Sequence, residues 1–406
     1  MIIINKEHGF TVFDGLISLK RQDLHPFDKV KLPQKPEFLP KNLPLGGLEH
    51  ALYLFYICLY MRGPITSKQA FEEFKKLYEY SPDLFDPKKI KNNPTFYTNI
   101  LIEQLKKGRL AMRAKDNARF WIENSKELFL GGWQGDPRNL FNVISDKNRN
   151  TSQAFEIVCK NIIRGRKKID SKNRNFFLFD INGSKDRGFY GFLEKMVSML
   201  SYFYVDANII PSFHFPSPVD FHLSRIFVMQ RIVIVTGNIN EINAPIVLPA
   251  GRKITASYTA KNHVSPKELS DALWSYSQKM CSKNPNNTRL TMGEPDGRKT
   301  VFTVAKKVKW TKSNIRKHDT SCGRCIFNET CTSFVPSGPY YTAGKLLMIN
   351  KDTPIQGNLF SFTPATEQIE ISKVKSKVKK RVKKEKEIES NQHPSLFDKN
   401  NNPLRS

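Results

Sequence analysis

Three of the six cysteines crowd into ten positions of the sequence, at a spacing that can bind a metal centre. The pattern Cys322-x2-Cys325-x5-Cys331 brings three thiolates within reach of one point, and Cys281 can supply a fourth. Four thiolates suit a tetrahedral zinc ion or a 4Fe-4S cluster. His318 could replace Cys281 as the fourth ligand, so both ligand sets stay open.

A single carboxylate, Asp220, follows a proline-rich stretch and stands at the start of an expected helix. The prolines at positions 216 and 218 favour an extended chain before it. Asp220 can simply cap the helix. A partly buried carboxylate at such a junction could also stabilise a developing cation or deprotonate a water.

A glycine turn, Gly188-Phe-Tyr-Gly191, precedes a helical stretch that carries Lys195. Backbone amides at a helix start after a glycine turn can hold a phosphate. Lys195 is a solvated lysine unless a pocket surrounds it, in which case its amine can act as a nucleophile.

Helices must position most of these residues, and the predicted fold class is mainly α. Residues 45–63 are apolar nearly all round, as a buried helix should be, and residues 67–80 place apolar side chains at helical spacing. Residues 265–281 form a capped amphipathic pattern. Cys58 and Cys159 lie in apolar helical stretches and are interpreted as core residues.

Three segments differ from this helical body. Residues 1–44 are rich in proline and predict an extended N-terminal strap. Residues 282–321 carry ten Lys and Arg against three acids around a Pro-Asp-Gly turn, which predicts a small basic β-like insertion. Residues 336–406 have little periodicity and are expected to be disordered.

The charge of the chain points to a polyanion. Its formal net charge is +27, of which the run 373–386 contributes +8, so the body must present positive surface as well. Nucleic acid is the first expectation. A membrane partner is not expected, because the longest apolar run, 51–61, is too short to span a bilayer. No secretory signal is seen at residue 1, and we expect a cytoplasmic, nucleoid-associated monomer.

Taken in order, the three motifs resemble those of the helix-hairpin-helix (HhH-GPD) DNA glycosylases of the endonuclease III type, which carry an iron–sulfur cluster. That family has a hairpin L-P-G-x-G-x-K, then V-D-T-H-x-x-R, then C-x6-C-x2-C-x5-C. Here Gly191 and Lys195 match the hairpin, and Val219-Asp220-Phe-His222-Leu-Ser-Arg225 follows the aspartate motif. The three clustered cysteines match the last three ligands, with Cys281 as the first.

The sequence departs from the family pattern at three places. Leu193 stands at the second hairpin glycine, which alters the expected amide cradle for a phosphate. Twenty-four residues separate Lys195 from Asp220, several more than in the family. Forty residues separate Cys281 from Cys322, where the family has six.

The resemblance implies two helical subdomains with a DNA-binding cleft between them. Residues 45–221 would form a helical barrel with the hairpin, its first helix packing on the cluster subdomain, and residues 222–335 would form that cluster subdomain. The residues expected to contact DNA are Gly188, Gly191, His222, Arg225, Lys306, Lys307, Lys309 and Arg324.

The activity implied is that of a DNA glycosylase, with or without lyase activity. A flipped base would enter the cleft. Asp220 would stabilise the sugar cation or activate the nucleophile, and Lys195 could attack C1′ to form a Schiff base. The 4Fe-4S cluster would be mainly structural, with zinc as the alternative metal.

Two other functions remain open on the same scaffold. One is a DNA base-modifying (hypermodification) enzyme, in which Asp220 assists substitution at a base. The other is a non-catalytic iron–sulfur DNA-binding protein. The tail adds a further prediction, because Gln356-Gly-Asn-Leu359-Phe360 resembles the peptide by which DNA-processing proteins dock on sliding clamps.

Overall fold

The computed structural model describes a set of segments that make up most of the chain before residue 281. The described residues are 2–24, 34–61, 67–107, 114–142, 144, 146–163, 187–235, 244–280, 289–290, 302–303 and 325–327. They are mainly helical, which confirms the predicted class. The Cys281, Cys322 and Cys331 ligands, the tail and most of the basic insertion lie outside these residues.

Eleven helices and four short strands are assigned within the described residues. The helices are α1 (Lys6–Arg21), α2 (Leu48–Tyr60), α3 (Ser67–Tyr80), α4 (Pro87–Asn92), α5 (Pro94–Lys107), α6 (Ala114–Leu130), α7 (Ser152–Ile162), α8 (Glu194–Asp206), α9 (Phe221–Met229), α10 (Ala244–Asn262) and α11 (Pro266–Lys279). The strands are β1 (Ile2–Ile4), β2 (Val233–Val235), β3 (Arg289–Leu290) and β4 (Phe302–Thr303). Single 3-10 turns occupy Pro36–Phe38, Pro82–Phe85 and Pro137–Leu140.

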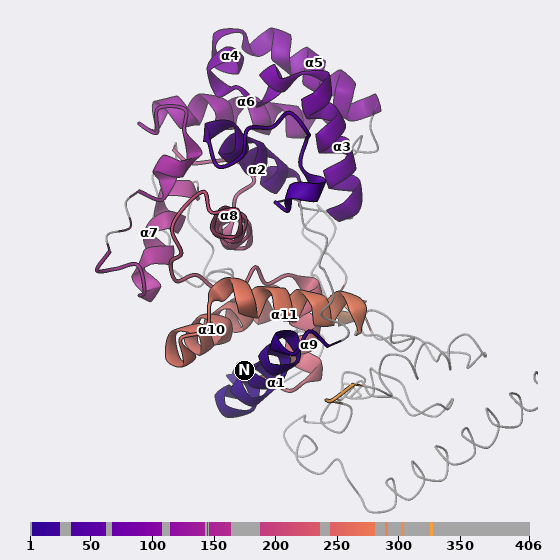
Figure 1. Ribbon diagram of the computed structural model, residues 1–406, viewed down its shortest axis with the longest axis vertical. Helices are drawn as coiled ribbons and strands as arrows, with labels where there is room; N and C mark the ends of the chain where they lie inside the picture. The colour runs from indigo at the N-terminus through magenta and orange to yellow at the C-terminus, as the bar shows by residue number, and fades with distance from the viewer. Residues whose placement is uncertain are drawn as a thin grey trace, which may run out of the picture.

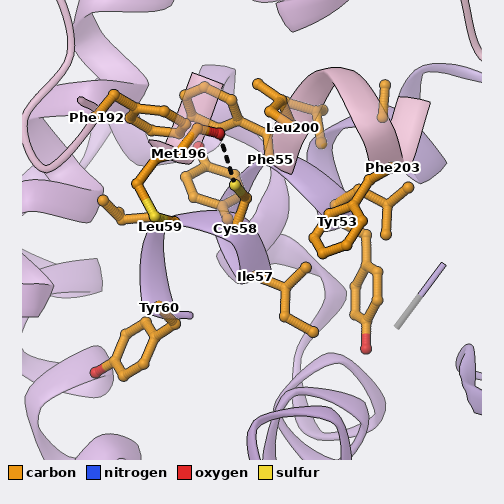
Figure 2. Close-up of a cluster of buried hydrophobic side chains, with 14 of the residues drawn as sticks. Tyr53, Phe55, Ile57, Cys58, Leu59, Tyr60, Phe192, Met196, Leu200 and Phe203 are labelled. Atoms are coloured by element: carbon orange, nitrogen blue, oxygen red, sulfur yellow. Dashed lines mark hydrogen bonds between the residues drawn. The ribbon is translucent and has the colours of Figure 1, made fainter. Parts of the chain in front are cut away.

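Helices α2 to α8 surround the larger of two hydrophobic cores, and we refer to them as the large body (Figure 1). Its centre is α2, whose residues from His50 to Tyr60 are all buried because the helix is apolar nearly all round. Trp121 of α6 stacks on Tyr56 at 4.4 Å between ring centroids. Cys58, predicted to be a core residue, is fully buried and its thiol donates to the carbonyl of Met196 (Figure 2). Cys159 is also fully buried.

Helices α1, α9, α10 and α11 surround the second core, and we refer to them as the small body (Figure 1). Phe13 of α1 lies edge-on to Tyr258 of α10, with ring centroids 5.2 Å apart. Strand β1 pairs antiparallel with β2, with Ile3 opposite Ile234. The small body is thus built from two parts of the chain, α1 with β1 and the segment from α9 onward, which precede and follow the large body in the sequence and pack against each other.

The predicted extended strap over residues 1–44 is wrong for its first half. Residues 6–21 form α1, whose buried face includes Phe10, Phe13, Leu16 and Ile17. The helix that packs with the C-terminal helices is therefore α1, and not the helix that begins near residue 45. That helix, α2, belongs to the core of the large body. The larger core ends at Phe215 and the second one resumes at Val219, a few residues from the predicted division after residue 221.

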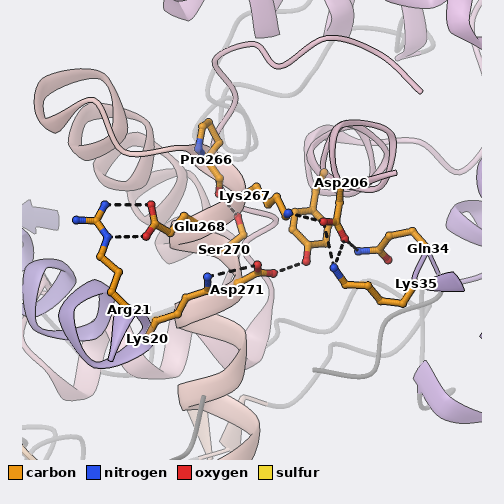
Figure 3. Close-up of polar contacts among 11 residues, drawn as sticks. Lys20, Arg21, Gln34, Lys35, Asp206, Pro266, Lys267, Glu268, Ser270 and Asp271 are labelled. Atoms are coloured by element: carbon orange, nitrogen blue, oxygen red, sulfur yellow. Dashed lines mark hydrogen bonds and ion pairs between the residues drawn. The ribbon is translucent and has the colours of Figure 1, made fainter. Parts of the chain in front are cut away.

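A buried carboxylate joins the two bodies at the end of α8 (Figure 3). Asp206 accepts hydrogen bonds from Gln34 and Lys35, which lie in the segment before α2, and from Lys267 of α11 at 2.6 Å. Burial would raise the pKa of Asp206, but the hydrogen bonds from these three side chains outweigh it and hold the pKa below its usual value. Nearby, the Tyr202 hydroxyl of α8 donates to Asp271 of α11.

The basic insertion is described at two short strands. Strand β3 pairs antiparallel with β4, with Arg289 opposite Thr303 and Leu290 opposite Phe302. This pairing agrees with a hairpin about the predicted Pro-Asp-Gly turn, and the turn itself lies outside the described residues.

Among the described helices, we find none with enough length and apolar character to span a bilayer.

Candidate functional site

The structure brings Lys195 and Asp220 together where the two bodies meet. Lys195 is the second residue of α8, and Asp220 immediately precedes α9. The Nζ atom of Lys195 lies 4.0 Å from Oδ2 of Asp220. Twenty-four residues separate them in the sequence, so their contact is produced by the fold and not by local geometry. The pair is the candidate functional site.

Asp220 caps the helix that follows it, which is one of the two interpretations that its position allowed. Its Oδ1 atom accepts a hydrogen bond from the backbone N–H of Leu223 at 3.2 Å, which is helix capping. Its Oδ2 atom faces Lys195. The carboxylate is therefore held by one oxygen while the other is directed at an amine.

The two side chains differ in their access to solvent. The Lys195 side chain is 26% exposed and the Asp220 side chain is 8% exposed. Lys195 also lies near the buried Cys58, whose thiol pKa is raised strongly by burial, so that this cysteine stays protonated beside the amine. A partly open amine beside a nearly buried carboxylate is an arrangement that can act on a group entering from solvent.

The glycine turn lies just before α8 in the sequence. Phe189 donates its N–H to the carbonyl of Ile162 at 2.9 Å, so the end of α7 lies directly beside the turn. Gly188 and Gly191 have φ angles of 102° and 80°, a conformation that favours glycine. Leu193 has a φ of −125°, so its backbone is unstrained and needs no glycine.

Side chains of α6 hold this glycine turn from inside the large body. Asn124 accepts from the N–H of Tyr190 at 2.7 Å and donates to its carbonyl at 3.0 Å. The N–H of Gly188 donates to Glu127 at 3.0 Å, so in this conformation that amide is directed at a protein carboxylate. Gly191 lies at the partly exposed side of the turn.

The remaining predicted DNA-contacting residues fall in two groups. His222 and Arg225 lie in α9, within two turns of Asp220. Lys306, Lys307, Lys309 and Arg324 lie outside the described residues, as does the clamp-like segment with Gln356, Leu359 and Phe360.

Of the predicted metal ligands, Cys325 is described. It packs against the small body, with its sulfur 3.1 Å from the Tyr276 hydroxyl of α11. Helix α11 ends two residues before Cys281, so the Cys325 thiol lies near the end of the helix that leads to a second expected ligand. Cys322, Cys331 and His318 lie outside the described residues, and within the described part no three His, Cys, Asp or Glu side chains form a metal-binding group.

Two polar groups lie against the Cys325 sulfur. Burial raises the pKa of the Cys325 thiol above its usual value and outweighs the opposing hydrogen bonds with the Tyr276 hydroxyl and the N–H of Phe327. These two donors are the kind of contact that stabilises a metal-bound sulfur. Cys281, Cys322, Cys325 and Cys331 are the residues that would hold a cluster, which would fix the chain after α11 to the small body.

An ion pair that the sequence did not predict lies directly behind the site. Arg252 of α10 donates from Nη1 to Oε2 of Glu194 at 2.6 Å, and their side chains are 6% and 0% exposed. Burial lowers the pKa of Arg252, although the Glu194 carboxylate opposes this. Glu194 is the residue before Lys195. The one signal in the sequence was a charged residue beside Lys195 at the start of an apolar helix, and it did not indicate a partner 58 residues away.

Comparison of the chain with protein-family models, with curated proteins and with solved structures gives no match. No relative therefore assigns a function to the pair of Lys195 and Asp220.

Proposed function

We propose that this protein is a DNA glycosylase that flips a base from the duplex and cleaves its N-glycosidic bond. The single observation that carries the proposal is the 4.0 Å approach of Lys195 Nζ to Asp220 Oδ2 between the two helical bodies. The net charge of +27 supports a polyanionic substrate. The order of the glycine turn, Lys195, Asp220 and the cysteines supports the helix-hairpin-helix glycosylase scaffold in particular.

Asp220 would carry the charge that bond cleavage requires. As the bond between C1′ and the base nitrogen breaks, its electron pair leaves with the base and the sugar becomes a cation. The Oδ2 carboxylate oxygen would stabilise that cation, as carboxylates do for oxocarbenium-like transition states. An attacking water would give its oxygen to C1′ and a proton to Asp220. Capping by Oδ1 holds the carboxylate in place throughout.

Lys195 would provide the lyase branch of the reaction. Its neutral amine, with its proton taken up by Asp220, would attack C1′ in place of water and displace the base. Ring opening then gives a Schiff base between the lysine nitrogen and C1′. Strand cleavage follows from that intermediate, and hydrolysis returns the free amine. The partial exposure of Lys195 leaves room for this attack.

A 4Fe-4S cluster on the four cysteines would supply a structural anchor. Of these ligands, Cys325 lies against Tyr276 in the small body. The anchored segment would include Arg324, which is adjacent to Cys325 in the sequence. The basic insertion begins directly after Cys281, another of the expected ligands. Positive side chains near the cluster would then contact phosphates. A sliding clamp would be bound through Gln356, Leu359 and Phe360.

The substitution Asp220→Asn tests the proposal. We expect base release from duplex DNA to fall by about 10²–10⁴-fold, because the amide keeps the size and cap geometry but loses the negative charge. Duplex binding at fixed salt should remain within about threefold, since it depends on phosphate contacts. Mass spectrometry of a panel of duplexes with damaged, mismatched and modified bases provides the readout. Unchanged base release would remove Asp220 from the mechanism.

The same assay separates the alternatives. Free base with an abasic site identifies a glycosylase, and additional strand cleavage that is lost in Lys195→Ala identifies the lyase branch. An intact nucleotide of altered mass would instead identify a base-modifying enzyme. Tight binding of every duplex with no change in mass would identify a non-catalytic DNA-binding protein.

A further inference from the structure

Two adjacent residues of α10 contact the segments that carry Lys195 and Asp220. Arg252 pairs with Glu194, the residue before Lys195. Gly251 packs closely against the segment that carries Asp220. A Cβ atom placed on Gly251 would lie 3.1 Å from the side chain of Val219, the residue before Asp220. One turn of α10 therefore lies against the neighbours of both site residues.

The same helix holds the loop that leads to Asp220. The N–H of Ser217 donates to the Thr255 hydroxyl at 3.3 Å, and that hydroxyl donates to the carbonyl of Arg252 at 3.0 Å. Further back along the loop, His214 Nε2 lies 2.9 Å from the carbonyl of Ala256. The aspartate loop is thus bound along α10 over consecutive turns, so its position follows that of α10.

The Lys195 side of the site belongs to the other body, and the Arg252–Glu194 pair is what fixes it to α10. Both side chains are removed from water, and a buried charge without its partner is strongly unfavourable. Such a pair tolerates little change in separation. Buried pairs of this kind are better suited to fixing a geometry than to adding stability.

We propose that Arg252 is a positioning residue, which through Glu194 sets the distance between Lys195 Nζ and Asp220 Oδ2. Its importance for catalysis rests on the proposed function, whereas its effect on the distance does not. Displacing reacting groups by about 1 Å can cost roughly 100-fold in rate. Loss of the pair is therefore expected to lower the rate of the chemical step and to leave duplex binding in place.

A second ion pair between the bodies provides a matched control. Lys267 of α11 binds Asp206, the last residue of α8, at 2.6 Å. Both pairs thus join α8 to the small body, one at each end of the helix. Lys267→Met removes a cation from the far end, while Arg252→Met removes one from the end beside the site.

The experiment is zero-length coupling of the full-length protein with a water-soluble carbodiimide, which joins an amine to a carboxylate only where they are in contact. Mass spectrometry of the digest measures the peptide in which Lys195 is joined to Asp220, and Lys195→Arg identifies that peptide by its loss. We expect the coupled peptide in the wild type and in Lys267→Met, and about a tenfold lower yield in Arg252→Met. Arg252→Lys, which retains the charge, should restore part of the yield.

A double variant keeps the test valid if Arg252→Met fails to fold. Glu194→Met/Arg252→Met leaves no unpaired buried charge, and so it should fold even if Arg252→Met does not. A wild-type yield in either folded variant would overturn the proposal, as would an equal loss in Lys267→Met or no coupled peptide in the wild type. Base release gives the second readout, with kcat lowered about 100-fold and KM little changed in the double variant. If the wild type releases no base from any duplex, the proposed function fails while the coupling yield still tests the role of Arg252.

Discussion

The carboxylates of Asp206 and Asp220 differ in the partners that surround them. Asp206 is 1% exposed and accepts hydrogen bonds from two lysines and a glutamine. Asp220 has one oxygen that caps α9 and a second oxygen that faces a partly exposed amine. Positive partners around Asp206 make it a fixed structural anion, whereas the surroundings of Asp220 suit a carboxylate that meets a developing positive charge.

Asp206→Asn should destabilise the protein in a pH-dependent way. Because the pKa of Asp206 is lowered in the folded state, its contribution is present above the unfolded pKa and is lost as the pH falls through the lower folded value. We expect a loss of about 1–3 kcal/mol of unfolding free energy at pH 7. The difference from the wild type should shrink below about pH 4.

Urea unfolding at pH 7 and pH 3 measures this difference. Asp146→Asn serves as the control, because Asp146 also pairs with a cation, that of Arg149, but its side chain is 93% exposed. A loss for Asp206→Asn that is the same at both pH values would contradict the assignment of Asp206 as an ionised anchor.

At the residue scale, the sequence indicated Lys195 and Asp220 as candidate site residues but gave no indication of the Glu194–Arg252 ion pair next to them. The first two stand in recognisable local patterns, a glycine turn before a helix and a proline loop before a helix. Glu194 and Arg252 have no local pattern, because their importance arises from burial and from a contact between different bodies. No spacing in a single sequence reports such a contact.

Among the helices, α1 shows how composition can conceal an element. The prolines of residues 1–44 all follow α1, beginning at Pro26, so averaging over the whole segment hid a helix. Gly9 and Gly15 lower its helix propensity further. Both face other segments, since a Cβ on Gly9 would meet Ile254 and one on Gly15 would meet Phe327. The residues that weaken the local signal are those that permit close packing.

Gly251→Ala is expected to destabilise α10 against α9. An added Cβ would clash with the Phe227 ring and approach Val219, and overpacking of this kind typically costs about 1–3 kcal/mol. Alanine is otherwise the better helix former, so the sign of the change reports the packing and not the propensity. Thermal unfolding gives the measurement. Phe227→Leu in the same chain should relieve part of the clash, and a stabilising effect of Gly251→Ala alone would contradict the packing described.

At the scale of the molecule, the main features of the protein are its two hydrophobic cores and its large net positive charge. The sequence pattern predicted the helical class, and the resemblance to the glycosylases implied a division after residue 221. It did not assign the N-terminal residues to the second core. That assignment depends on the pairing of Ile2–Ile4 with Val233–Val235, more than 200 residues away.

Metal and acid-labile sulfide content test the proposed cluster on the whole chain. Protein purified without oxygen should contain about four irons and four sulfides and show a broad visible absorption. Cys325→Ser should reduce both contents and the absorption. Cys58→Ser is the control, because that thiol is buried in the large body, and its substitution should leave the metal content unchanged. One zinc per chain without colour would contradict the cluster and favour the zinc alternative.

The pairing of β1 with β2 also sets an order for synthesis on the ribosome. The residues that become β1 and α1 emerge before the large body, yet their partners, β2 and helices α9 to α11, emerge only after it. At roughly 5–20 residues per second, the N-terminal helix waits on the order of ten seconds to most of a minute with its apolar face uncovered. The large body can meanwhile form its core. The residues of β1 and α1 are therefore made before the large body but find their partners after it, and with an uncovered apolar face they are a segment that a chaperone could protect.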